Sequence, residues 1–240
     1  LKGIECEAVE LNFNTCKRHT LELAKILDWY FTAKGYDKTK IVGSFNWDPM
    51  EKIVVKGLDT VALFAQAPQI VEAMKEYPNF RTICVNAVAL NNNGAYIVQE
   101  LGYALAWGNE YMNQLVEAGT DADEAAKNIK FNLGISENFF MEMAKFRAAR
   151  MLWAEIVKQY APKDDASCMM CVNAATSKYN MTMFDSYVNM LRSQTEAMSA
   201  RETSTSALMS NSVTRPIIAS ITIGTPQRII ATHMMSNGNG

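Results

Sequence analysis

Hydrophobic and polar positions follow two periods along the first 200 residues, and the period changes from block to block. Short apolar runs predict strands at residues 5–11, 40–45, 82–87, 129–133 and 169–174. Longer stretches with helical spacing predict helices at residues 15–34, 59–77, 94–118, 121–128, 138–160 and 184–200. Strands that alternate with helices are typical of α/β proteins, in which crossover helices join parallel strands.

This alternation fits two architectures, an open doubly wound sheet and a (β/α)8 barrel. A doubly wound sheet that binds dinucleotides carries a Gly-rich fingerprint after its first strand, and no predicted strand here is followed by one. The missing fingerprint is an argument against the doubly wound sheet. A closed barrel needs eight strands, and the pattern predicts five.

Residues 201–240 differ in composition from the rest of the chain. They contain no aromatic residue, no Lys and no Asp, and Ser and Thr supply 12 of the 40 positions. Such a segment cannot bury much apolar surface, so we expect loop or disorder there. The sequence therefore predicts one domain over residues 1–200 and a separate tail over residues 201–240.

The predicted helix at residues 138–160 (NFFMEMAKFRAARMLWAEIVKQY) has no Gly or Pro, and its apolar residues spread around most of its circumference. A helix of this kind is covered on more than one side. Arg147 and Arg150 lie in its middle and would then need carboxylates or an anionic ligand as partners. One interpretation is a structural ion pair, with Glu142 as the partner of Arg147. The other is an anion-binding role.

This segment resembles the signature helix of the methylmalonyl-CoA mutase family. Residues 96–111 (YIVQELGYALAWGNEY) are similar to the preceding family segment, and residues 176–200 (TSKYNMTMFDSYVNMLRSQTEAMSA) to the following one. The resemblance covers residues 1–200. It implies a TIM-type (β/α)8 barrel, incomplete here because five strands cannot close it. It also implies rearrangement of acyl-CoA carbon skeletons with adenosylcobalamin. We interpret the end of the resemblance near residue 201 as truncation or loss of the reading frame.

The resemblance also locates the catalytic positions. Catalytic members end one strand with a motif like S-G-Y-H-x-x-E-A-G-A, whose His can hydrogen-bond the substrate thioester oxygen. Aligned on Gly94, this chain has Val88 at the Tyr position and Ala89 at the His position. In a second motif, like R-T-H-x-Q-T-S-G-W, Asn173 occupies the His position and Ala175 the Gln position. These degenerate positions imply a chain without catalytic residues.

A non-catalytic member of the family is the small subunit of heterodimeric methylmalonyl-CoA mutase, whose partner is the catalytic large subunit. The resemblance therefore implies that acyl-CoA reaches the complex through the partner. It also implies that the partner binds adenosylcobalamin, because this chain has no D-x-H-x-x-G motif to supply an imidazole to cobalt. Arg147 would be a relic of a CoA phosphate contact.

Two alternatives to the small-subunit hypothesis remain open. The first is an active acyl-CoA mutase of altered specificity, which would have to use Asn86, Asn91 and Asn173 at the strand ends. The second is a fragment without a function of its own. Turnover by the isolated chain would favour the first, and failure to bind a catalytic subunit would favour the second.

The net charge and the cysteine content argue against several other classes of protein. A net charge of −2 gives no electrostatic footprint for nucleic acid, and no apolar stretch reaches membrane-spanning length. Five scattered cysteines indicate reduced thiols in the cytoplasm. The single C-x-x-C of Cys168 and Cys171 lacks further ligands for a metal, since His19 and His233 lie far away. The first residue, Leu1, suggests that the natural start is missing.

Overall fold

The computed structural model describes the whole chain except residues 2, 15, 58–60, 209–217, 223–229 and 232–240. Its strands form two hydrogen-bonded groups. The first group holds β1 (Leu11–Phe13), β2 (Gly43–Phe45) and β3 (Phe80–Arg81). The second group holds β4 (Ile83–Asn86), β5 (Ile129–Ile135), β6 (Cys171–Thr176), β7 (Ile218–Thr222) and β8 (Ile230–Ala231).

Each strand within a group pairs with the strand that follows it in the chain. The pairs are parallel except β7 with β8, which is antiparallel. The two groups continue one another because only Thr82 separates β3 from β4, and the amide of Cys84 donates to the carbonyl of Trp47, 3.0 Å away, just beyond β2. A doubly wound sheet reverses its strand order at a switch point, and the described strands show no reversal.

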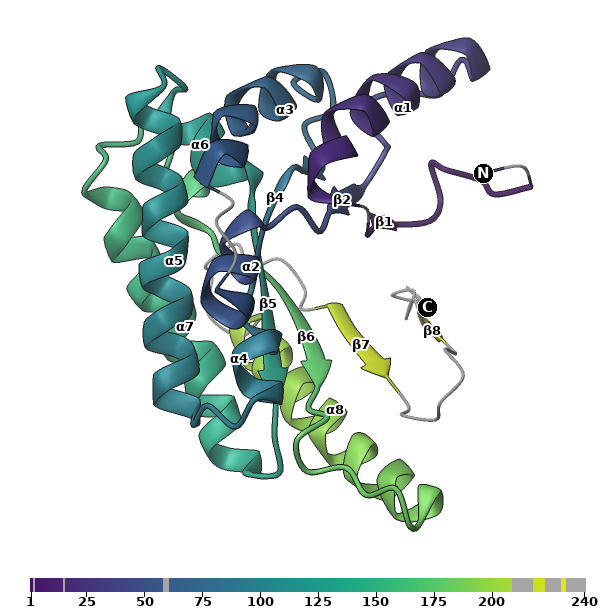
Figure 1. Ribbon diagram of the computed structural model, residues 1–240, viewed down its shortest axis with the longest axis vertical. Coiled ribbons are helices and arrows are strands. Elements are labelled where there is room, and N and C mark those ends of the chain that lie inside the picture. The colour runs from purple at the N-terminus through teal and green to yellow at the C-terminus, as the bar shows by residue number, and fades with distance from the viewer. Residues whose placement is uncertain (2, 15, 58–60, 209–217, 223–229, 232–240) are drawn as a thin grey trace.

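Helices connect the strands and cover one side of the sheet (Figure 1). The α-helices are α1 (Thr20–Lys34), α2 (Pro49–Lys56), α3 (Ala67–Ala73), α4 (Val88–Asn92), α5 (Ile97–Glu117), α6 (Ala122–Asn128), α7 (Phe139–Lys158) and α8 (Ser186–Leu208). Short 3₁₀ helices lie at η1 (Lys17–His19), η2 (Val61–Gln66) and η3 (Asp165–Cys168). The predicted α/β class with parallel strands is confirmed. No described helix combines the length and apolar character needed to cross a bilayer.

The centre of the core lies where α5 and α7 pack on β5. Phe131 of β5 and Trp153 of α7 meet edge to face with ring centroids 4.7 Å apart. Gly108 of α5 lies against both rings, and a Cβ atom built there would come within 2.5 Å of Phe131 and 2.9 Å of Trp153. The absence of a side chain at Gly108 therefore sets how closely α5 approaches the sheet. Because Phe131 faces these helices, its neighbours along β5 face the opposite side.

Two predictions for the N-terminal half are wrong. The first strand is Leu11–Phe13 rather than residues 5–11, and its pairing begins where the amide of Leu11 donates to Val42. The alternating residues before it form turns. Asp48 and Pro49 begin α2, whereas the sequence pattern predicts no helix between residues 45 and 59, because an Asp-Pro pair suits a helix start as well as a loop. Asp48 Oδ1 accepts from the amide of Glu51 at 3.2 Å, which is an N-cap.

The helix boundaries also needed correction. Helix α4 ends at Asn92 and a turn follows at Asn93 and Gly94, so the long helix begins at Ile97 instead of Gly94. The signature helix begins after Asn138, and Ser136 is not its N-cap. The Ser136 hydroxyl donates instead to Glu142 Oε1 at 2.6 Å. Gly35 ends α1 as predicted, in a left-handed conformation with φ of 71°.

The segment after residue 200 contains regular structure in its described part, contrary to the expected loop. Helix α8 continues to Leu208, and β7 pairs in parallel with β6 through Asn173 and Ile218. Composition missed these elements because strand pairing can order a segment that has few large side chains. The domain boundary at residue 200 stays a prediction. The remainder of the tail lies outside the described residues.

Candidate functional site

Five asparagines lie at one level of the sheet, two of them in the middle of strands and three at or just after the ends of strands. Asn86, Asn132 and Asn173 are neighbours in the register of β4, β5 and β6. Asn14 and Asn46 directly follow β1 and β2. The side chain of Asn132 donates to Asn46 Oδ1 at 3.4 Å and accepts from Asn173 Nδ2 at 3.2 Å. We call this set the asparagine tier.

A second polar level lies two residues earlier on the same strands, because alternate residues of a strand share a face. It contains Lys130 of β5, which is only 3 % exposed. The Lys130 ammonium donates to Asn12 Oδ1 at 2.9 Å and to Ser44 Oγ at 2.7 Å. In the described part of the chain, no carboxylate forms an ion pair with it. A buried cation is thus held by neutral oxygens alone.

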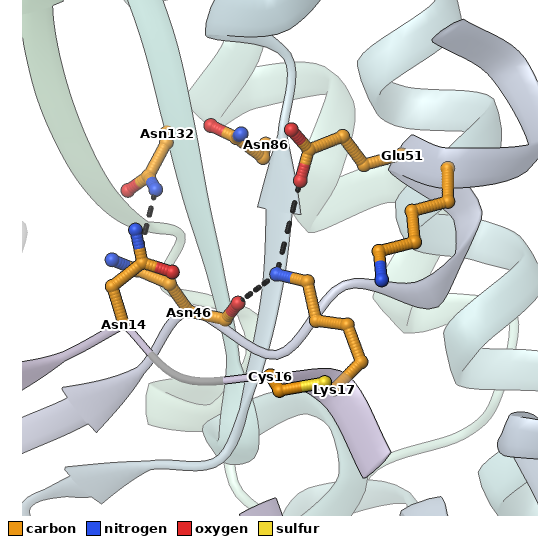
Figure 2. A pocket seen from close by; sticks show the side chains of 8 residues that line it. Asn14, Cys16, Lys17, Asn46, Glu51, Asn86 and Asn132 are labelled. Carbon is orange, nitrogen blue, oxygen red and sulfur yellow. Dashed lines mark hydrogen bonds and ion pairs between the residues drawn. The ribbon is translucent and has the colours of Figure 1, made fainter. Parts of the chain in front are cut away.

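The asparagine tier opens into a pocket of about 320 Å³ (Figure 2). The pocket is lined by Asn14, Asn46, Asn86 and Asn132 of the tier together with Cys16, Lys17, Glu51 and Lys52. Figure 2 shows the Lys17 side chain pointing toward Asn46 and Glu51. Its ammonium donates to the carbonyl of Asn46 and lies 3.8 Å from Glu51 Oε2.

The buried side chain of Asp48 holds residues next to this pocket in place. Its carboxylate is fully buried and accepts hydrogen bonds from the Tyr111 hydroxyl and the amide of Asn86, both at 2.7 Å. Burial raises the pKa of Asp48 to about 7, although these hydrogen bonds and Lys17 oppose the rise. The indole of Trp47 donates to the backbone carbonyl of Lys17 at 2.9 Å. These contacts fix the ends of β2 and β4 relative to η1.

The four degenerate positions lie on two elements. Val88 and Ala89 are half-buried in α4, directly after β4, and do not line the pocket. Asn173 belongs to the asparagine tier. Ala175 pairs in register with Gly134 of β5 and adds no polar side chain. None of the four side chains can act as an acid, a base or a nucleophile near neutral pH.

The prediction for the signature helix is wrong for one of its two arginines, since Arg150 is half-buried, and it missed the lysine that is fully buried. Arg147 is exposed, and Glu142 pairs with Lys145 instead. The Lys145 ammonium lies 2.6 Å from Glu142 Oε2, 2.7 Å from Glu100 Oε2 and 2.7 Å from the carbonyl of Gly134. All three charged side chains are fully buried. The three-residue spacing of Glu142 and Lys145, which places both on one face of a helix, was the sequence signal for this ion pair. A phosphate contact by Arg147 stays a proposal.

A further buried carboxylate lies between α7 and α8. Glu196 of α8 is 2 % exposed, and its Oε1 accepts from Asn180 Nδ2 at 2.7 Å. Burial raises the pKa of Glu196 to about 7, and the nearby carboxylates of Glu137 and Glu142 add to the rise. Arg192 donates to the carbonyl of Asn180 at 2.7 Å, so the loop before α8 is held to the helix.

Metal-ligand chemistry is missing from the part of the chain that the structure describes, where no three His, Cys, Asp or Glu residues cluster suitably. Cys168 is buried and Cys171 half-buried. The described imidazole, His19, is exposed, and its Nδ1 lies 2.9 Å from Glu22 at the start of α1. His233 lies outside the described residues.

Comparison with known sequences assigns the chain to a family. The family model described as Methylmalonyl-CoA mutase matches residues 1–229. The chain belongs to the methylmalonyl-CoA mutase family. This match confirms the resemblance of the three sequence segments, and it extends beyond residue 200, where those segments end.

Three relatives illustrate the relation. The chain is 46 % identical over 201 residues to the methylmalonyl-CoA mutase small subunit of Porphyromonas gingivalis, covering 83 % of this chain and 32 % of the relative. It is 34 % identical over 187 residues to the human mitochondrial methylmalonyl-CoA mutase (75 % and 24 %). The large subunit of Streptomyces virginiae is 33 % identical over 187 residues (75 % and 25 %). The chain thus spans about a third or less of these mutases.

Proposed function

We propose that this chain is a non-catalytic small subunit of adenosylcobalamin-dependent methylmalonyl-CoA mutase. Its partner in the heterodimer is the catalytic large subunit, which binds acyl-CoA and interconverts methylmalonyl-CoA and succinyl-CoA. The observation that carries the proposal is the apolar pair Val88 and Ala89 where β4 leaves the sheet. The name of the Porphyromonas relative, a small subunit, supports the same role.

The chemistry at the strand ends supports a non-catalytic role. A thioester oxygen that gains charge during a rearrangement is stabilised by a donor held in a dry pocket. At the end of β4 this chain offers an isopropyl and a methyl group. The nearest polar groups on the neighbouring strands are amides of the asparagine tier, and Asn132 already bonds Asn46 and Asn173. The scaffold is kept, while the reactive donor is missing.

The described residues do not fit a cobalamin site on this chain. The lower ligand for cobalt would be an imidazole, and the described imidazole, that of His19, lies exposed beside Glu22. We therefore assign adenosylcobalamin to the partner subunit.

The order of the strands supports a barrel-type fold. In a (β/α)8 barrel each strand pairs with the next one in the chain, as β1 to β3 and β4 to β7 do within their two groups. The polar face with Lys130 and the asparagine tier would then line the interior, while Phe131 faces the outer helices. We infer that these strands form part of an incomplete TIM-type barrel.

Co-purification tests the proposal. The full chain is expressed with the large subunit of the same organism, and complex formation and mutase turnover are measured. We expect a complex whose turnover disappears when the motif His of the large subunit is replaced by Ala. Ala89→Ser in this chain is the matched change and should leave kcat unaltered. Failure to form a complex at micromolar concentration would favour the fragment alternative.

The alternative of an active mutase with altered specificity receives less support. Of the three asparagines that it requires, Asn86 and Asn173 belong to the asparagine tier, whereas Asn91 is buried and donates to Glu100 at 3.0 Å. Turnover of any acyl-CoA by this chain without the large subunit, with adenosylcobalamin present, would reverse this ranking.

A further inference from the structure

We infer that the pocket at the asparagine tier binds a small phosphate-bearing anion. The inference goes beyond the subunit role and does not depend on it, because it concerns a cavity with its own charge and hydrogen-bonding groups. Four observations support it: an excess of lysine, the burial of two of the lysines, two amide side chains that are free to bond, and a lining without apolar side chains.

Lysines outnumber carboxylates around the pocket. Lys17 and Lys52 line it and Lys130 lies on the adjacent strand level, whereas the acidic groups are Glu51 and the buried Asp48. Asp48 also has a pKa raised to about 7, so its negative charge is incomplete near neutral pH. The pocket therefore carries a positive potential that attracts anions.

Two of these ammonium groups are removed from water. Lys17 is 7 % exposed and Lys130 is 3 % exposed. Lys17 has Glu51 as a distant partner at 3.8 Å, and Lys130 has only the neutral oxygens of Asn12 and Ser44. Removing a cation from water is costly unless an opposite charge lies nearby. A bound anion would supply that charge to Lys17, which lines the pocket, while Lys130 adds to the positive potential from the adjacent level.

Hydrogen-bond donors are available in the same cavity. The side-chain amides of Asn14 and Asn86 line the pocket and form no hydrogen bond with another described residue. Each can offer an N–H₂ group to a ligand oxygen. Lys52 likewise forms no ion pair with a described carboxylate. The pocket can therefore surround an anion with charged and neutral donors.

The residues that line the pocket indicate which kind of anion it can bind. Its side chains are asparagine, lysine, glutamate and one cysteine, so no aliphatic or aromatic side chain lines it to hold a hydrocarbon chain. Lysine binds phosphate as a point charge, and a tetrahedral phosphate accepts hydrogen bonds from several directions. The volume of about 320 Å³ lies at the low end for ligand sites, which limits the ligand to a small molecule.

Titration of the full chain with inorganic phosphate at low ionic strength tests the inference. Calorimetry or ³¹P NMR should detect saturable binding that weakens as salt is added. Lys17→Met and Lys52→Met should each raise the dissociation constant about tenfold, which is the effect of losing one charge-assisted hydrogen bond. Lys52→Arg should retain binding, because it keeps the charge.

Lys158→Met is the matched control, since it removes one exposed positive charge from the far end of α7. It should leave binding unchanged. Absence of saturable phosphate binding would overturn the inference, as would an equal loss in Lys158→Met and Lys52→Met. Lys52 is half-buried at the surface of α2, so Lys52→Met keeps the test decisive if Lys17→Met fails to fold.

The same assay separates two sources of the phosphate group. Tighter binding of inorganic phosphate would identify the free ion, and tighter binding of glycerol 3-phosphate would identify an esterified phosphate. Either result supports the phosphate assignment. Malonate serves as a dianion without phosphate, and an affinity for malonate equal to that for phosphate would overturn it.

Discussion

Lys145 of α7 and Glu100 of α5 form an ion pair of 2.7 Å in which both side chains are fully buried. Glu142 adds a second carboxylate at 2.6 Å, so this lysine neutralises one of two buried negative charges and bridges them both. Burial raises the pKa of Glu100, while Lys145 opposes that rise. The ammonium therefore joins α5 and α7 at the carboxyl end of β5.

Replacing this lysine should be strongly destabilising. We expect Lys145→Met to lower the free energy of unfolding by about 3–5 kcal/mol, because two buried carboxylates lose their cation. Urea denaturation measures the change. Lys158→Met, which breaks an exposed pair with Glu155, should cost less than about 1 kcal/mol. Similar losses in the two variants would contradict the role given to Lys145.

Lys130 should behave in the opposite way although it is equally buried. It has no described carboxylate partner, so Lys130→Met removes an uncompensated cation, and Asn12 and Ser44 keep their hydrogen bond to each other. We expect the free energy of unfolding to stay the same or rise by about 1 kcal/mol. The same urea assay tests this. A loss as large as that of Lys145→Met would mean that the ammonium stabilises the sheet.

Two glycines of α5 should respond in opposite directions to alanine. A Cβ at Gly108 would approach Phe131 to 2.5 Å, whereas a Cβ at Gly102 meets no atom within 4 Å. Gly108→Ala should lower the melting temperature, with a cost of about 1–3 kcal/mol from overpacking. Gly102→Ala should raise stability by about 0.5–1 kcal/mol, because alanine favours the helix. Thermal unfolding of both variants checks the packing of α5 on β5.

Glu196 should make stability depend on pH. Its pKa is about 7 in the folded chain and lower when unfolded, so the folded state holds the proton over the intervening range. Its contribution to the free energy of unfolding should therefore be greatest below about pH 4 and should fall as pH rises toward 7. Glu196→Gln should flatten this fall and stabilise the chain at pH 8. Its amide oxygen can still accept from Asn180.

Glu117→Gln on the exposed surface of α5 is the control for that experiment. It should leave the pH profile unchanged. Asp48 should also make the free energy of unfolding fall as pH rises, since its pKa is likewise raised to about 7. A residual slope in Glu196→Gln is therefore expected, whereas an unaltered slope would show that Glu196 ionises freely.

The period of the apolar residues was sufficient to predict most strands and helices. It failed where the same residues suit two structures, as with Asp48 and Pro49, which punctuate a loop or begin a helix. It also failed where an alternating segment lacks a pairing partner, as at residues 5–11. Pairing is a tertiary property, and composition cannot supply it.

The candidate site was only partly visible in the sequence. Alignment to the family motifs located Val88, Ala89, Asn173 and Ala175, and Asn86 was named among the possible polar groups. The asparagine tier depends on the register between strands, which no single strand encodes. Likewise, a helix that is apolar nearly all round does not reveal which of its cations is buried. Lys145 was missed for this reason, and Arg147 was chosen in its place.

The pairing of each strand with its predecessor has a consequence for synthesis on the ribosome. Within each of the two groups, the parallel partner of every strand after the first has already been translated. The sheet can therefore grow at one edge as the nascent chain emerges, without holding an early strand unpaired for a distant segment. Its N-terminal edge can acquire protease resistance before translation ends.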